Sequence, residues 1–106
     1  MSEEERIFFE NLPETVTIYR GCSLKEIKSN NFRFSWSLDK NVADFFAFDY
    51  NKNLKIKSNI VVRTVSKNSL IAYFNGRDEQ EVIYIQDFDT KFQLSNKFDV
   101  VAEGQQ

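Results

Sequence analysis

Apolar residues recur along the chain with two different periods, which predicts short helices interleaved with strands. Residues 15–20 are β-branched and alternating, so they predict a strand that Gly21 ends. Residues 32–38 alternate with period two and predict a second strand. One face of that strand is expected to carry the large apolar side chains Phe32, Phe34, Trp36 and Leu38.

An apolar side and a capping signal predict where the first two helices lie. Residues 3–11 favour a short helix with Ile7 and Phe8 on its apolar side. Further along, Ser23 is followed three residues later by Glu26, a spacing typical of a capping box. A second short helix is therefore expected directly after Ser23.

A third helix is expected over residues 40–49, with Asp39 as its N-cap. Its phenylalanines follow the helical spacing, so the pattern predicts that they belong to the core. The apolar side of this helix is expected to carry Val42, Phe45 and Phe46. The polar residues 50–59 predict a loop, and residues 59–65 predict a strand.

The second half of the chain is dominated by strand signals. Residues 69–74 fit either a helical turn or a strand, and Asn75-Gly76 after them is a strong turn signal. Residues 80–85 and residues 91–101 predict further strands. Helices early and strands late predict a mixed α+β fold with strands flanked by short helices.

Composition narrows the chemistry that the chain can perform. The 106 residues include eleven phenylalanines but no histidine, which excludes an imidazole base and a histidine metal ligand. The single cysteine, Cys22, cannot form an intrachain disulfide, so a reducing cytosol is expected. No apolar run approaches the roughly 18 residues of a membrane-spanning helix, so no membrane partner is expected. Any chemistry must use carboxylates, hydroxyls, Arg, Lys or Tyr.

Charge is distributed unevenly along a chain whose net charge is only −2. Residues 1–14 are acidic and are expected to form an N-terminal segment that precedes a single domain over residues 15–106. Residues 50–77 carry six basic side chains and no acidic one. Such a run is typical of a solvated surface, and it is also a candidate for binding phosphate.

Three short motifs occur in order on the predicted elements. They are Tyr19-Arg20-Gly21 at the end of the first strand, Ser35-Trp36-Ser37 in the second, and Glu79-Gln80-Glu81 at the start of a late strand. In this order they resemble the Arg–Ser–Glu class of ADP-ribosyltransferases, the fold of arginine-modifying bacterial toxins and related phage enzymes. The resemblance spans residues 15 to about 101. Trp36 stands where the family usually has threonine.

The resemblance implies a mono-ADP-ribosyltransferase that uses NAD as co-substrate and needs no metal. Cleavage of the N-glycosidic bond of NAD expels nicotinamide and develops positive charge on the ribose. Arg20 would contact the NAD phosphate or ribose, because its planar guanidinium donates in a fixed fork. Gly21 would let the backbone approach the nicotinamide amide.

The same resemblance assigns the hydroxyls and the carboxylates. Ser35 would hydrogen-bond to Glu81 and to the nicotinamide ribose, and Ser37 would lie beside it at the cofactor. Glu81 would be the carboxylate that stabilises the developing cation. Glu79 shares a face with Glu81 if the strand is regular, and it would engage the acceptor.

For the acceptor, the resemblance favours a protein arginine over a nucleic acid. It also suggests a phage effector or toxin-like protein that modifies a host protein in the bacterial cytoplasm. Residues 50–59 and 74–80 are the loops expected to set acceptor specificity. Two alternatives stay open: a non-enzymatic inhibitor or interaction module on the same fold, and a small RNA-binding protein that uses residues 50–77 with exposed aromatics such as Tyr50 and Tyr73.

Overall fold

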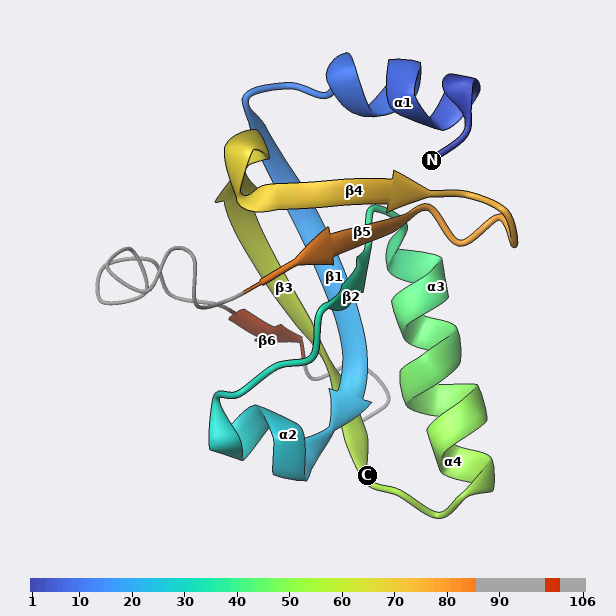
Figure 1. Cartoon of the computed structure of the whole chain (residues 1–106). Helices are drawn as coiled ribbons and strands as arrows, with labels where there is room; N and C mark the ends of the chain where they lie inside the picture. Colours follow the sequence, from blue (N-terminus) through green and yellow to red (C-terminus); the bar gives the residue numbers. More distant parts are fainter. Residues whose placement is uncertain (86–98, 102–106) are drawn as a thin grey trace.

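An antiparallel sheet with short helices around it forms an α+β fold (Figure 1). The computed structural model describes residues 1–85 and 99–101. In spatial order the strands are β4 (Leu70–Phe74), β5 (Glu81–Tyr84), β2 (Ser35–Ser37), β1 (Thr15–Ser23), β3 (Ser58–Ser66) and β6 (Asp99–Val101). The helices are α1 (Glu3–Glu10), α2 (Leu24–Ser29), α3 (Lys40–Asp44), the π-helix η1 (Phe45–Tyr50), α4 (Asn51–Asn53) and the 3-10 turn η2 (Lys67–Ser69). None of the helices described is long and apolar enough to cross a bilayer.

The main core lies on one face of the sheet, where the alternation of β1 and β3 gathers their apolar side chains. Trp36 is central to it, because its ring makes edge contacts with Phe32 and Tyr84 and its indole N–H donates to the carbonyl of Arg33. The buried members are Val16, Ile18, Cys22, Phe32, Trp36, Val61, Val65, Leu70, Tyr73, Val82 and Tyr84.

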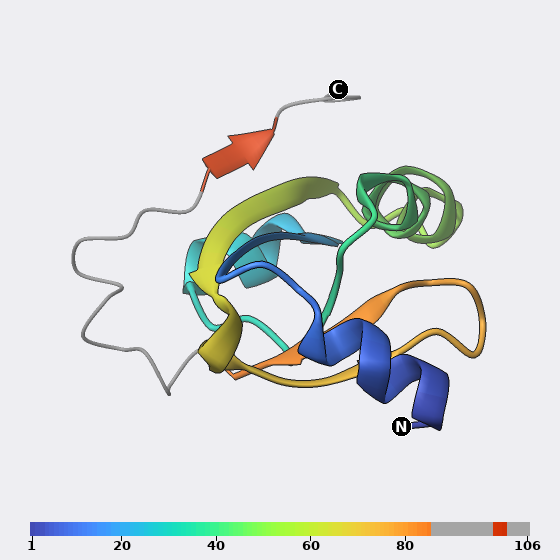
Figure 2. The same ribbon diagram turned by 90° about the horizontal axis from the view of Figure 1, so that it is seen from above.

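A helical column made of α3, η1 and α4 covers the opposite face of β1 and β3; Figure 2 shows it end-on beside the strands. Its buried residues are the small Ala43 and Ala47, which pack with Ile60. They face Gly21, whose missing side chain lets the column approach the strand backbone. Small residues on both sides therefore set the distance between helix and sheet.

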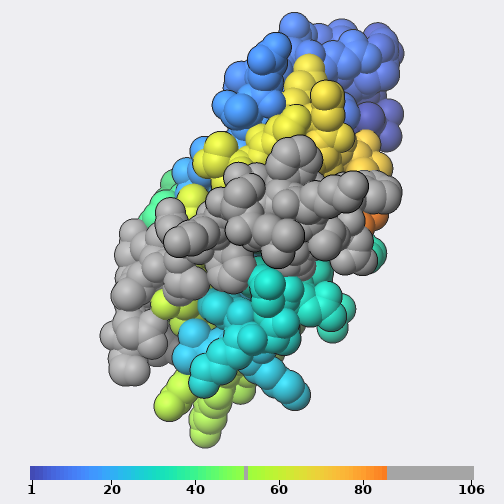
Figure 3. Space-filling view, turned by 90° about the vertical axis from the view of Figure 1, so that its left-hand side faces the viewer, coloured from blue at the N-terminus to red at the C-terminus, as the bar shows by residue number. Residues whose placement is uncertain are grey.

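Residues 1–14 pack on the edge strand β4 through α1. The ring of Phe8 stacks on Tyr73 with centroids 4.6 Å apart. Lys67 donates its ammonium to the carbonyl of Glu10 and its backbone N–H to that of Glu14. In the space-filling view, α1 lies at one end of the molecule and α2 at the other (Figure 3).

The strands differ from the prediction in extent. Gly21 does not end β1, because the strand pairs with β3 as far as Ser23. The predicted strand over 32–38 contracts to three residues, so the expected common face is not kept: Phe34 is 56% exposed whereas Phe32 is buried. Residues 69–74 form β4, which resolves the open choice in favour of a strand. Of the strands predicted over 91–101, residues 91–98 lie outside the described residues.

The third helix begins at the predicted N-cap, since the Asp39 carboxylate accepts from the backbone N–H of Asn41. Beyond Asp44 it widens into a π-helix, in which the N–H of Asn51 donates to the carbonyl of Phe46. Ala43 and Ala47 are the buried residues that face the sheet, with Phe48 partly buried beside them. The prediction for Phe45 is wrong, because its side chain is half exposed. The predicted loop over 50–59 is interrupted by α4 at one end and by β3 at the other.

Candidate functional site

A narrow cleft opens where β1 and β2 diverge. These strands pair in register at Tyr19 and Ser37, and the cleft lies beside this point with a cavity volume of about 30 Å³. We call it the β1–β2 cleft. Its lining gathers the residues of the three motifs with one helix, namely Tyr19, Arg20, Gly21, Ser35, Trp36, Ser37, Val42, Ala43, Glu79 and Glu81.

The hydrogen bond predicted between Ser35 and Glu81 is confirmed. The Ser35 hydroxyl donates to Glu81 Oε2 at 2.5 Å. Antiparallel pairing of β2 with β5 places Ser37 opposite Glu81, so Ser35 reaches the carboxylate diagonally on the same face. Ser35 is exposed and Glu81 is half-buried, so this pair is accessible from solvent.

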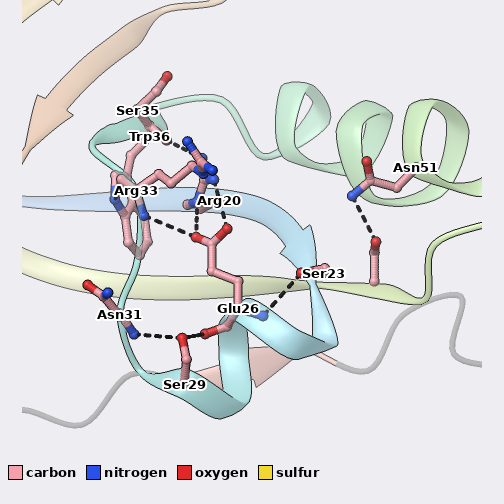
Figure 4. Close-up of polar contacts among 10 residues, drawn as sticks. Arg20, Ser23, Glu26, Ser29, Asn31, Arg33, Ser35, Trp36 and Asn51 are labelled. Carbon is pink, nitrogen blue, oxygen red and sulfur yellow. Dashed lines mark hydrogen bonds and ion pairs between the residues drawn. The ribbon is translucent and has the colours of Figure 1, made fainter. Parts of the chain in front are cut away.

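Arg20 is bound to protein by all three of its nitrogens (Figure 4). Nε and Nη2 donate to the carboxylate of Glu26 at 2.6 and 3.1 Å, and Nη1 donates to the carbonyl of Ser35 at 2.8 Å. Both side chains of the pair are about 15% exposed or less. Arg20 thereby ties α2 to the strand that carries Ser35.

This arrangement changes the predicted role of Arg20. A guanidinium has five N–H donors, and three of them are used within the fold. Its first task is to position Ser35, and two donors at most are left for a ligand. The role predicted for Gly21 changes as well, because the helical column occupies the space that its missing side chain leaves.

Glu26 is a residue of this site that the sequence prediction assigned elsewhere. The Ser23 hydroxyl does cap α2 by accepting from the N–H of Glu26. The Glu26 carboxylate, however, binds Arg20 and the N–H of Arg33 instead of closing a capping box. Burial raises the pKa of Glu26, but these hydrogen bonds and the positive charges of Arg20 and Arg33 outweigh it, so the pKa is lowered overall.

Replacing Glu26 by Gln should reduce the free energy of unfolding by about 2 kcal/mol near neutral pH, the scale of a hydrogen bond to a charged group. A carboxyl whose pKa is lower in the folded chain stabilises the fold above its unfolded pKa, which is near 4.5. That stabilisation is lost as the pH falls through the folded pKa. Urea unfolding of both chains across this range should therefore show their stabilities converging in acid, and a difference independent of pH would contradict the assignment.

Ser37 and Glu79 are joined by a structural hydrogen bond. The buried Ser37 hydroxyl donates to the carbonyl of Glu79 at 2.7 Å and accepts from the N–H of Asp39. Its first partners are therefore backbone groups.

The regular strand expected over residues 79–81 is not formed. β5 begins only at Glu81, and Gln80 lies before it with a φ of 43°. Asp78 also has a positive φ, of 58°. Glu79 and Glu81 both line the β1–β2 cleft. The strand pleating that was expected to bring the two residues to one face is therefore absent, and a turn precedes Glu81 instead.

A second, larger cleft adjoins the first and shares both carboxylates. It has a cavity volume of about 240 Å³ and is lined by Glu5, Phe74, Gly76, Arg77, Glu79 and Glu81. We call it the outer cleft. Arg77 is its cationic member, and its Nη2 lies 3.8 Å from Glu79 Oε1.

The turn between β4 and β5 is held from α1, an interaction that the sequence did not predict. Glu5 accepts from the N–H of Asn75 at 2.6 Å and from the N–H of Ser2 at 2.7 Å. The Asn75 side chain in turn accepts from the N–H of Gln80. The backbone hydrogen bonds from Asn75 and Ser2 lower the pKa of Glu5, so it stays ionised while it holds the turn.

One side chain of the basic run, Arg63, is buried, whereas Lys55, Lys57 and Arg77 are exposed. Arg63 is 2% exposed and lies over the ring of Tyr84, with no hydrogen-bond acceptor among the residues described. It is therefore not part of an RNA-binding surface, although Tyr50 is exposed.

Burial raises the pKa of Cys22 to about 12, which disfavours the reactive thiolate. Within the described ranges, no three Cys, Asp or Glu side chains are close enough together to hold a metal ion.

No family model, curated protein or solved structure matches this chain. A functional interpretation therefore rests on the side chains that the fold brings together. Residues of three motifs separated by up to about sixty positions meet in one accessible cleft, and the hydrogen-bonded pair of Ser35 and Glu81 is part of its lining.

Proposed function

We propose that the protein is a mono-ADP-ribosyltransferase that cleaves NAD in the β1–β2 cleft and transfers ADP-ribose to an arginine of an acceptor protein. The hydrogen bond between Ser35 and Glu81 carries this proposal. It holds a carboxylate at an open cleft, where such a group can stabilise the positive charge that develops on a ribose.

The surroundings of this pair fit the same chemistry. Arg20 fixes the carbonyl of Ser35, so the hydroxyl that orients Glu81 stands on a supported strand. The remaining donors of Arg20 are suited to the phosphates of NAD. The reaction needs neither histidine nor metal, which agrees with a chain that has no histidine.

Glu79 is assigned to the acceptor because it faces both clefts. The outer cleft is the larger of the two and carries the carboxylates of Glu5, Glu79 and Glu81. An arginine entering there would meet negative charge and a planar acceptor for its guanidinium. We extend the proposal to a host protein in bacterial cytoplasm only by analogy with the family that the motifs resemble.

Of the groups expected to bind RNA, Arg63 and Tyr73 are buried, whereas Tyr50 and the basic side chains Lys55, Lys57 and Arg77 are exposed. The interaction module has the same fold but recognises a partner protein through residues 50–77 and does not turn over NAD. Release of nicotinamide from NAD separates it from the enzyme, because a module that does not bind NAD releases none.

Two serines on the same strand offer a matched pair of variants. Ser35→Ala removes the hydroxyl that orients Glu81, so turnover should fall by roughly tenfold or more. Because Ser35 is exposed, the free energy of unfolding should change by less than about 0.5 kcal/mol. Ser37→Ala should do the reverse: it leaves two buried backbone partners unpaired, lowers stability by about 1–2 kcal/mol and affects turnover less.

The measurements are initial rates of nicotinamide release and urea unfolding for both variants. Equal, negligible effects of the two substitutions on turnover would mean that this strand face lines no active site. The enzyme proposal would then give way to the interaction module.

A further inference from the structure

We propose that Arg77 is an internal acceptor: the protein transfers ADP-ribose to its own Arg77 side chain. This inference rests on the proposed function, because it uses the same carboxylates and the same donor. It is carried by the position of Arg77 beside Glu79 in the outer cleft, which also contains Glu81.

The other arginines are occupied, buried or distant from this cleft. The chain has five, all within residues 1–85. Arg20 is bound to Glu26 and to the carbonyl of Ser35, and Arg63 is buried. Arg6 pairs with Glu3 and Glu10 along α1, at 2.5 and 2.9 Å. Arg33 lies in the connection between α2 and β2 and lines neither cleft.

Arg77 combines a free side chain with a position at the acceptor carboxylate. Its side chain is 84% exposed, whereas that of Glu79 is 31% exposed. The 3.8 Å between their charged atoms exceeds a hydrogen-bond distance, and such an exposed pair contributes little stability. The guanidinium can therefore leave this pairing and turn toward a ribose bound beside Glu81 at low cost.

The step balances without a further reactant. The bond between ribose C1′ and the nicotinamide nitrogen breaks, and its electron pair leaves with nicotinamide. A guanidinium nitrogen of Arg77 forms the new bond to C1′ while Glu81 stabilises the positive charge on the sugar. The proton displaced from that nitrogen passes to the Glu79 carboxylate and then to water. The products are nicotinamide, one proton and an Arg77 side chain that carries ADP-ribose.

The test is to incubate the purified chain with NAD and to follow three quantities: nicotinamide released, intact mass, and the modified residue from peptide mapping. We expect one ADP-ribose, located on Arg77, with a first-order rate constant that does not change with protein concentration. Arg77→Lys should abolish the modification. Arg6→Lys, which changes an arginine outside both clefts, should be modified at Arg77 at the rate of the unsubstituted chain.

A further variant tests the role of Glu79 in the same reaction. Glu79→Gln should lower the ratio of ADP-ribose on Arg77 to nicotinamide released by about tenfold or more, since the amide cannot accept the proton. Circular dichroism of each variant checks that the fold is retained.

The outcomes separate this inference from the function on which it rests. Nicotinamide release with no ADP-ribose on the chain, or with ADP-ribose on another residue, would overturn the internal acceptor and leave the proposed function standing. A rate constant that rises with protein concentration would overturn the intramolecular step. Absence of nicotinamide release would overturn both proposals.

Discussion

Replacing Glu81 by Gln should lower the rate of nicotinamide release from NAD by at least about a hundredfold, the scale of losing one group that stabilises transition-state charge. Gln keeps the size of the side chain and an oxygen that can accept from the Ser35 hydroxyl, so the geometry of the pair is preserved. What is removed is the negative charge beside the ribose. The measurement is the initial rate at saturating NAD, compared with the unsubstituted chain.

Glu14→Gln is the matched control for this substitution. Glu14 is an exposed carboxylate that lines neither cleft, so its loss should leave the rate unchanged. Urea unfolding of Glu81→Gln should show a stability within about 1 kcal/mol of the unsubstituted chain, because only an exposed pair is altered. Full activity of a folded Glu81→Gln chain would remove this residue from the chemistry.

Adding a methyl group at Gly21 should reduce the free energy of unfolding by about 3 kcal/mol or more, at the upper end of the cost of overpacking. The added carbon would lie 2.1 Å from the carbonyl oxygen of Ala43 and 2.9 Å from the backbone nitrogen of Ala47. Both are backbone atoms of the helical column, so no side-chain rotation relieves the clash. A typical domain of this size has only about 5–15 kcal/mol of stability, so Gly21→Ala should be largely unfolded under mild denaturing conditions.

Gly76 provides the matched control. A methyl group there has no atom within 4 Å, so Gly76→Ala should change stability by about 0.5 kcal/mol or less. The measurement is the urea midpoint of each variant, followed by circular dichroism. If both substitutions had equally small effects, the close packing of the column on β1 would be wrong.

The sequence predicted those parts of the site that depend on local patterns. Alternation predicted the strand that carries Ser35 and Ser37, and the capping preferences of Ser23 and Asp39 located the starts of two helices. The hydrogen bond between Ser35 and Glu81 joins residues 46 positions apart, and it was implied by the family resemblance rather than by a local pattern. The helix starts and the strand that carries Ser35 could be predicted because helix capping and strand alternation are decided within a few residues.

The contacts that could not be predicted depend on which of several possible partners the fold brings close to a side chain. Glu26 stands at the position that a capping box requires. Its carboxylate binds Arg20 instead, because a part-buried guanidinium is a stronger partner than the backbone N–H of the N-cap residue. Glu5 holds Asn75 across 70 residues, a pairing with no local signal. Spacing alone favoured Phe45 for the buried face of the third helix, whereas the close approach to Gly21 is made by Ala43 and Ala47.

The central claim is that the β1–β2 cleft binds NAD and breaks its glycosidic bond. The most direct test is to incubate the purified, unsubstituted chain with NAD alone and to quantify nicotinamide over time, with NAD binding measured by calorimetry on the same preparation. We predict binding, and release of nicotinamide in proportion to protein concentration. A folded chain that neither binds NAD nor releases nicotinamide would contradict the claim.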